Sequence, residues 1–166
     1  MGKGINLALT KSLVEFNSLL KTAIKAVSFK KLSLADELAE VDSWKFQVGN
    51  YVRVQEFDED EEEKEAALFW IGFAWKENDE CEPSIWLEFD ARTCREKYWE
   101  KINELVGTSG KYYSEIDLEF SQVYMNAWIH FFLKEEYLKQ FYDENADFNA
   151  QKEILIRFIK EVLEKL

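Results

Sequence analysis

The stretch ALFWIGFAWK at residues 67–76 constrains the fold more than any other, because it is apolar on both of its alternating faces. A strand of this kind is buried from both sides, so we expect it in the centre of a sheet. The segment before it, WKFQVGNYVRVQEF at residues 44–57, alternates apolar and polar residues with a period of two. This alternation predicts a strand with one solvated face. A second interpretation stays open, in which a two-residue turn at Gly49-Asn50 divides the segment into a hairpin.

Apolar residues that recur at three- and four-residue steps predict the helices. The first helix covers residues 7–28, and a short second helix covers Leu34–Val41, where Ser33 can serve as the N-cap. Further helices are expected at residues 93–107, at Lys134–Tyr142 and at Asn149–Leu166.

Two more segments alternate as strands do, namely PSIWLEFDA at residues 83–91 and KYYSEIDLEF at residues 111–120. Residues 122–133 are expected to pair with the second of these in a hairpin, and a helix in that segment is left open as the alternative.

The elements follow the order α-α-β-β-β-α-β-β-α-α, which predicts an α+β fold. We expect N-terminal helices, an antiparallel sheet of about five strands with one crossover helix, and C-terminal helices packed on the sheet. A chain of 166 residues that is 47% hydrophobic can bury a sizeable core. Residues 1–166 are therefore expected to form a single domain, in which residues 1–42 are a helical, lysine-bearing N-terminal arm.

The charge of the chain is uneven. The net charge is −12, but six lysines and one glutamate give residues 1–34 a charge of +5, which leaves −17 for the remaining 132 residues. A body of this charge repels the phosphates of nucleic acids and attracts basic surfaces. We therefore expect a basic protein partner and no direct binding of nucleic acid by the acidic body.

Metal-ligating and redox residues are few. Two cysteines, Cys81 and Cys94, and one histidine are too few for a tetrahedral zinc site, so neither a metal nor a cofactor is expected. Free thiols and the lack of a long apolar run favour a cytoplasmic protein without a membrane span. Cys94 lies near the predicted start of a helix, and it is interpreted either as a reactive thiol or as a small buried residue.

The acidic run that precedes residues 67–76 is the main candidate for a binding site. It does not follow the pattern of a calcium-binding EF-hand loop, because the sixth position from Asp58 is Glu63 rather than glycine and the twelfth is Phe69 rather than glutamate. The run is interpreted either as a solvated connection between two strands or as a surface that steers a basic partner.

Glu88 and Asp90 share one face of the strand predicted at residues 83–91. The order α-β-β-β-α-β over residues 7–120 resembles the core of the PD-(D/E)xK nucleases, in which acids on adjacent strands hold a divalent ion beside a lysine. The resemblance implies a metal-dependent hydrolase that uses Glu88, Asp90 and Arg92. The sequence departs from the family pattern because Arg92 stands where a lysine is expected and residues 67–76 supply no acid.

His130 is the only histidine of the chain. Strand alternation places it on an aromatic face, where Glu115, Asp117 or Glu119 on the neighbouring strand could orient it as a general base. A half-buried histidine without a chemical role is the other interpretation.

These observations favour an acidic module that binds and blocks a basic protein, as immunity proteins, antitoxins and inhibitors of nucleic-acid enzymes do. The sequence favours a binding protein over an enzyme. A nuclease-like hydrolase, active or degenerate, and a non-catalytic subunit or scaffold of a larger complex are the alternatives. The residues expected to bind the partner are Asp58, Glu59, Asp60, Glu61, Glu62 and Glu63, with Glu115, Asp117 and Glu119 as a second patch.

Overall fold

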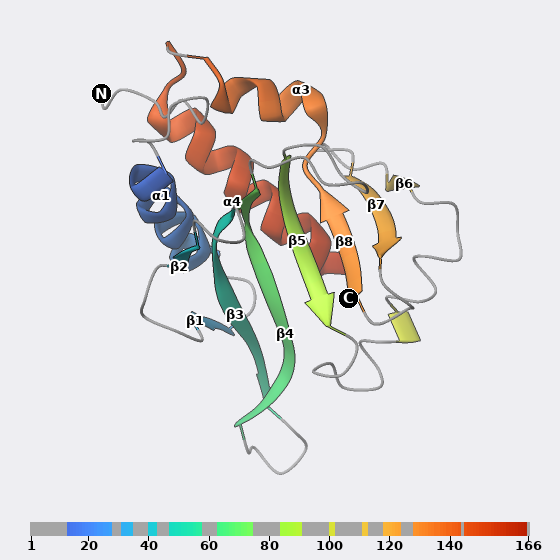
Figure 1. The fold of residues 1–166 in the computed structure, drawn as a ribbon. Coiled ribbons are helices and arrows are strands. Elements are labelled where there is room, and N and C mark those ends of the chain that lie inside the picture. The colour runs from blue at the N-terminus through green and yellow to red at the C-terminus, as the bar shows by residue number, and fades with distance from the viewer. Residues whose placement is uncertain are drawn as a thin grey trace.

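The computed structural model shows one antiparallel sheet with helices packed on it (Figure 1). It describes residues 13–27, 31–34, 40–42, 47–57, 63–74, 84–90, 100–101, 111–112, 118–123, 128–143 and 145–165. The strands are β1 (Lys31–Leu34), β2 (Glu40–Asp42), β3 (Gln47–Phe57), β4 (Glu63–Ala74), β5 (Ser84–Asp90), β6 (Lys111–Tyr112), β7 (Leu118–Val123) and β8 (Trp128–Phe132). The helices are α1 (Leu13–Ala26), α3 (Glu135–Leu138), the 3-10 turn η3 (Lys139–Phe141) and α4 (Phe148–Lys165).

The strands are ordered β1-β3-β4-β5-β8-β7-β6, and β2 pairs with the same edge of β3 as β1 does. All described pairings are antiparallel. The α+β class is confirmed, with helices at both ends of the described chain and five longer strands, β3, β4, β5, β7 and β8, forming the body of the sheet. After β5 the chain runs to the far edge of the sheet, and β8 returns to pair with β5.

The main hydrophobic core lies between the sheet and helices α1 and α4. On this helix-covered face, rows of apolar residues cross the strands in register, for example Val48, Phe73 and Ile85. Helix α1 contributes Phe16, whose ring meets those of Phe73 and Phe141 edge-on, each with a centroid separation of 6.2 Å. The apolar stripes that the sequence predicts on both long helices are therefore the stripes that pack on the sheet.

Strand β4 is central, as its apolar sequence predicts. Residues from both of its faces, including Trp70 and Ile71, are buried. The hairpin alternative at Gly49-Asn50 is wrong, because β3 runs through both residues and Gly49 pairs with Gly72 of β4. The hydrogen bonds between β3 and β4 outweigh the local preference of Gly49-Asn50 for a turn.

The helix predicted at Leu34–Val41 is wrong at both ends. Leu34 closes β1, while Glu40 and Val41 begin β2, and both strands pair with β3. Pairing with β1 and β2 supplies hydrogen-bond partners for the backbone N–H and C=O groups along the edge of β3. These hydrogen bonds outweigh the local helix propensity of residues 34–41.

Residues 122–133 divide between two strands. Gln122 and Val123 end β7, and Trp128–Phe132 forms β8, so the strand interpretation is confirmed there and the two strands pair. Of the helix predicted at 93–107, the described residues are Glu100 and Lys101, and both are helical. The predicted helix Lys134–Tyr142 is split into α3 and η3, whereas α4 agrees with its prediction within a residue at each end.

Candidate functional site

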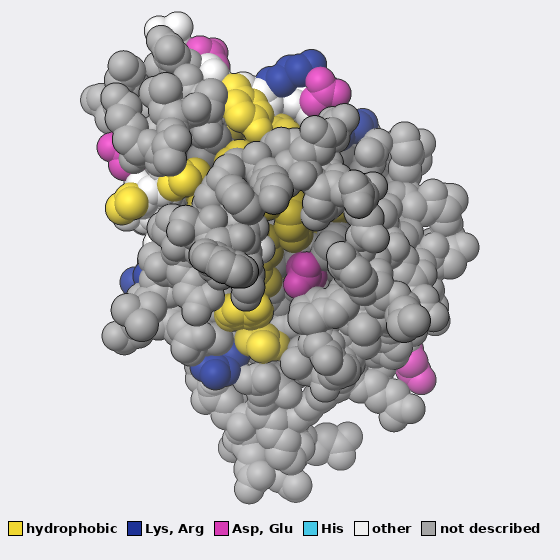
Figure 2. Space-filling view, in the orientation of Figure 1, with side chains coloured by type: hydrophobic (Ala, Val, Ile, Leu, Met, Phe, Trp, Pro, Cys, Tyr) yellow, Lys and Arg dark blue, Asp and Glu magenta, His cyan; other side chains and the backbone are white. Residues whose placement is uncertain are grey.

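The face of the sheet that turns away from α1 and α4 carries a second, aromatic cluster. Trp70, Ala74 and Trp86 are buried together, and the half-buried Phe132 packs against them. The ring centroids of Trp70 and Trp86 are 5.7 Å apart, and those of Trp86 and Phe132 are 5.8 Å apart. Figure 2 views this side and shows hydrophobic side chains in a hollow in the middle of the face, with one acidic side chain among them.

A pair of glycines makes room for the indole of Trp70. Gly49 and Gly72 are opposite each other in β3 and β4, and a Cβ on either residue would collide with the Trp70 ring. Glycine inside a strand often marks a close approach of this kind, so the two glycines are the signal by which the sequence could have indicated the cluster.

Glu88 lies in the row of residues that crosses this aromatic face. Glu88 of β5 pairs with Trp70 of β4 on one side and with His130 of β8 on the other. His130 in turn pairs with Ser121 of β7. Glu88 is thus the acidic residue in register with His130, because the residue of β7 opposite His130 is a serine. The suggested alternatives do not take that place: Glu119 pairs with Phe132, and Glu115 and Asp117 are outside the described residues.

The nuclease-like metal site finds little support in this geometry. Glu88 and Asp90 are both on β5, and the residue of β4 opposite Glu88 is Trp70 rather than an acid. Arg92 is outside the described residues. Among the side chains that the structure describes, no group of three or more His, Cys, Asp or Glu residues could hold a metal ion.

The acidic run belongs to a hairpin that projects from the sheet (Figure 1). Glu63 and Glu65 are part of β4 and pair with Phe57 and Gln55 of β3, so the connection is shorter than the run itself. Among the described residues, pairing of β4 with β5 begins at Phe69, so residues 63–68 of β4 continue past the described pairing with β5. We call residues 55–65 the acidic arm. Asp58, Glu59, Asp60, Glu61 and Glu62 are outside the described residues.

A bulge separates the acidic arm from the rest of the hairpin. Val54 pairs with Ala67 but Gln55 pairs with Glu65, so Ala66 is an extra residue in β4. Such a bulge bends a strand and increases its twist. The arm therefore diverges from the plane of the sheet at this point.

The two predicted acidic patches lie apart. Glu119 is on β7, and both β5 and β8 lie between β7 and β4, a separation of about 14 Å at the usual strand spacing. Along β4, the register row that contains Glu119 passes through Gly72, which is seven residues or about 23 Å from Glu65. Any surface that contacts both patches must span the sheet diagonally.

Tyr142 follows the 3-10 turn η3 and packs edge-on against Phe73 at a centroid distance of 6.4 Å. Partial burial raises the pKa of its phenol above the ordinary value of 10.0. At neutral pH Tyr142 is therefore an uncharged ring at the end of the core. Cys94, in contrast, is outside the described residues, and its role stays a prediction.

Comparisons with family models, with curated proteins and with solved structures found no match to this chain. In the described part of the chain, every helix is too short or too polar to cross a bilayer.

Proposed function

We propose that the protein binds a basic protein partner through the acidic arm and blocks that partner's basic surface, in the manner of an immunity protein, antitoxin or inhibitor. The observation that carries this proposal is that β3 and β4 stay paired past the described pairing of β4 with β5, with Glu56, Glu63 and Glu65 in that part of the ladder. The residues that we propose for the contact are Asp58, Glu59, Asp60, Glu61, Glu62 and Glu63, with Glu115, Asp117 and Glu119 as a second patch.

The charge of the arm suits such a role. Residues 55–65 contain eight acids and one lysine, a net charge of −7. Charges concentrated on a projecting element steer an oppositely charged partner and raise its association rate, and salt screens the effect over about 10 Å at 0.1 M. A body of −17 extends the same field across the molecule.

Affinity requires apolar anchors beside the charges. Tyr51 is on β3, the strand that leads into the arm, and its side chain is 37% exposed. An exposed tyrosine supplies a large contact area with little loss of conformational entropy. We propose Tyr51 as one anchor, and the cytosol, where Cys81 and Cys94 would stay reduced, as the compartment.

The test is a pull-down from the native host with the unmodified protein and two variants of equal charge. The arm variant changes Asp58 and Asp60 to Asn and Glu59, Glu61 and Glu62 to Gln. The control variant changes five exposed glutamates outside the arm to Gln: Glu15, Glu135, Glu136, Glu153 and Glu164.

We expect the unmodified protein and the control variant to recover the same basic protein, and the arm variant to lose it. With the purified partner, the arm variant should raise Kd at least about tenfold, or 1.4 kcal/mol, in low salt. Recovery of no basic partner at low and moderate salt, or equal losses in both variants, contradicts the proposal.

A further inference from the structure

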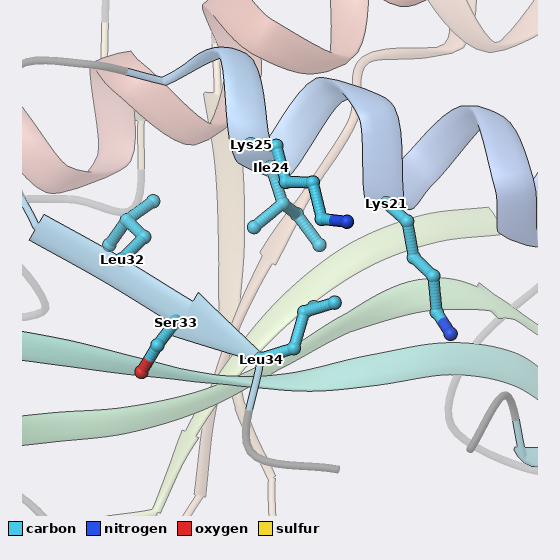
Figure 3. A pocket seen from close by; sticks show the side chains of 6 residues that line it. All are labelled: Lys21, Ile24, Lys25, Leu32, Ser33 and Leu34. Carbon is cyan, nitrogen blue, oxygen red and sulfur yellow. The ribbon is translucent and has the colours of Figure 1, made fainter. Parts of the chain in front are cut away.

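A groove of about 490 Å³ lies between α1 and β1 (Figure 3). The described residues that line it are Lys21, Ile24, Lys25, Leu32, Ser33 and Leu34. Ile24 points from α1 toward β1, and Leu32 and Leu34 point from β1 toward α1. Both lysines extend from the same side of α1. The groove thus has an apolar floor and a basic wall.

The strand on the other side of this groove is an edge strand. In the described sheet β1 is the terminal strand, and it pairs with β3 alone. Backbone N–H and C=O groups on the outer side of such a strand can pair with an added strand, which is a common way of binding an extended peptide. Leu32 and Leu34 are on the helix side of β1, so a strand added there would place alternate side chains beneath α1.

The lysine spacing matches the side-chain spacing of an added strand. Lys21 and Lys25 are one helical turn apart, a rise of about 6 Å along α1. Same-face residues of a strand repeat about every 6.8 Å. Carboxylates two positions apart on the helix-facing side of an added strand would therefore reach the two lysines, while an apolar side chain at the next helix-facing position would contact Ile24 and the two leucines.

We propose that this groove binds an extended acidic segment of a protein partner, which joins the sheet as a strand beside β1. The helix-facing residues of that segment include two acids that are two positions apart, followed by an apolar side chain. Charge complementarity with Lys21 and Lys25 selects an acidic segment over a basic one. The lysines of the groove attract a partner of the charge opposite to that attracted by the acidic arm, whose first residue, Gln55, pairs with Lys31 of β1.

The probe is a fluorescent twelve-residue peptide with the six-residue repeat leucine, threonine, glutamate, threonine, glutamate, threonine, so that one face carries two successive glutamates after each leucine. Its binding to the full chain is measured by anisotropy. Two control peptides are used, one with lysine in place of glutamate and one with N-methyl groups on alternate backbone amides, which prevents strand pairing.

We expect the first peptide to bind and both control peptides to bind at least about tenfold more weakly. Lys25→Glu should weaken binding of the first peptide at least about tenfold, because it reverses an exposed charge on the wall of the groove. Lys139→Glu, an equal charge change on η3 outside the groove, should change Kd less than about twofold. Hydrogen exchange should show that bound peptide protects the amides of residues 31–34.

Three results would each overturn the inference: no binding of the acidic peptide, equal binding of either control peptide, or equal Kd values for the Lys25 and Lys139 variants. Protection of amides elsewhere in the sheet, with none in β1, would also overturn it. Circular dichroism of both variants checks that their helix content is unchanged, and the peptide controls need no change in the protein at all.

Discussion

The two faces of the sheet are packed in different ways. The helix-covered face packs rows of Val, Ile, Leu and Phe against α1 and α4. The opposite face packs the large ring of Trp70 onto Gly49 and Gly72, where side chains are missing. Truncation should therefore damage the first face most, and enlargement should damage the second. The four predictions below test this contrast, from the largest expected effect to the smallest.

The largest effect is expected on the helix-covered face. Phe16 is fully buried and contacts rings of β4 and η3, so Phe16→Ala should lower the free energy of unfolding by about 3–5 kcal/mol through lost burial and a residual cavity. Denaturant unfolding measures the loss. Val14→Ala is the control on the same helix, since Val14 is 66% exposed, and it should cost less than about 0.5 kcal/mol. Similar losses for both variants would contradict this packing of α1.

On the aromatic face, adding a single methyl group should destabilise the protein. A Cβ on Gly72 would collide with the carbonyl oxygen of Val48 and lie 2.6 Å from the Cα of Gly49. Gly72→Ala should therefore cost about 2–3 kcal/mol. Adding Trp70→Leu to Gly72→Ala should not restore stability, because the clash with the backbone persists. Full recovery in the double variant would show that only the indole obstructs the site.

A buried polar pair interrupts the helix-covered face. Asn50 Nδ2 of β3 donates a hydrogen bond to Asn17 Oδ1 of α1 over 2.8 Å, and the two residues are 3% and 5% exposed. Asn50 Oδ1 is buried without a hydrogen-bond partner among the described residues. Asn17→Leu alone should cost about 1–2 kcal/mol because it leaves the Asn50 amide unpaired.

The double variant Asn17→Leu with Asn50→Val should be more stable than Asn17→Leu alone, because it removes both polar partners from the core. A double-mutant cycle by denaturant unfolding gives the coupling energy. Additive losses in the two single variants would mean that the two side chains do not depend on each other.

The smallest effect concerns Tyr142 at the margin of the core. Burial raises its pKa in the folded protein above 10.0, so the folded state favours the neutral phenol. Its contribution to stability is complete below pH 10 and is lost as the pH rises through the folded pKa. Tyr142→Phe should therefore reduce the loss of stability above pH 10. A difference absorbance titration against this variant gives the pKa, and a value at or below 10 would contradict the burial.

Local sequence patterns predicted the helices and strands themselves better than they predicted which of these elements pair or pack together. The stripes of α1 and α4 and the two apolar faces of β4 follow from periodicity alone, because each is a property of adjacent residues. The same patterns misplaced Leu34–Val41, whose helix propensity gives way to pairing with β3. For the candidate site, the acids at 58–63 were visible in the sequence, but only the tertiary structure shows that β3 and β4, which flank them in the chain, continue past the described pairing of β4 with β5.

The sequence by itself determined the class of fold, the buried faces of the main elements and the separation of a basic N-terminal segment from an acidic body. Composition and periodicity carry these properties directly. Only the tertiary structure decided that His130 pairs with Glu88 in the ladder, that Gly49 and Gly72 lie together under Trp70, and that Lys21 and Lys25 line a groove beside an edge strand. These are relations between residues far apart in the chain, and strand order, which no local pattern specifies, brings them together.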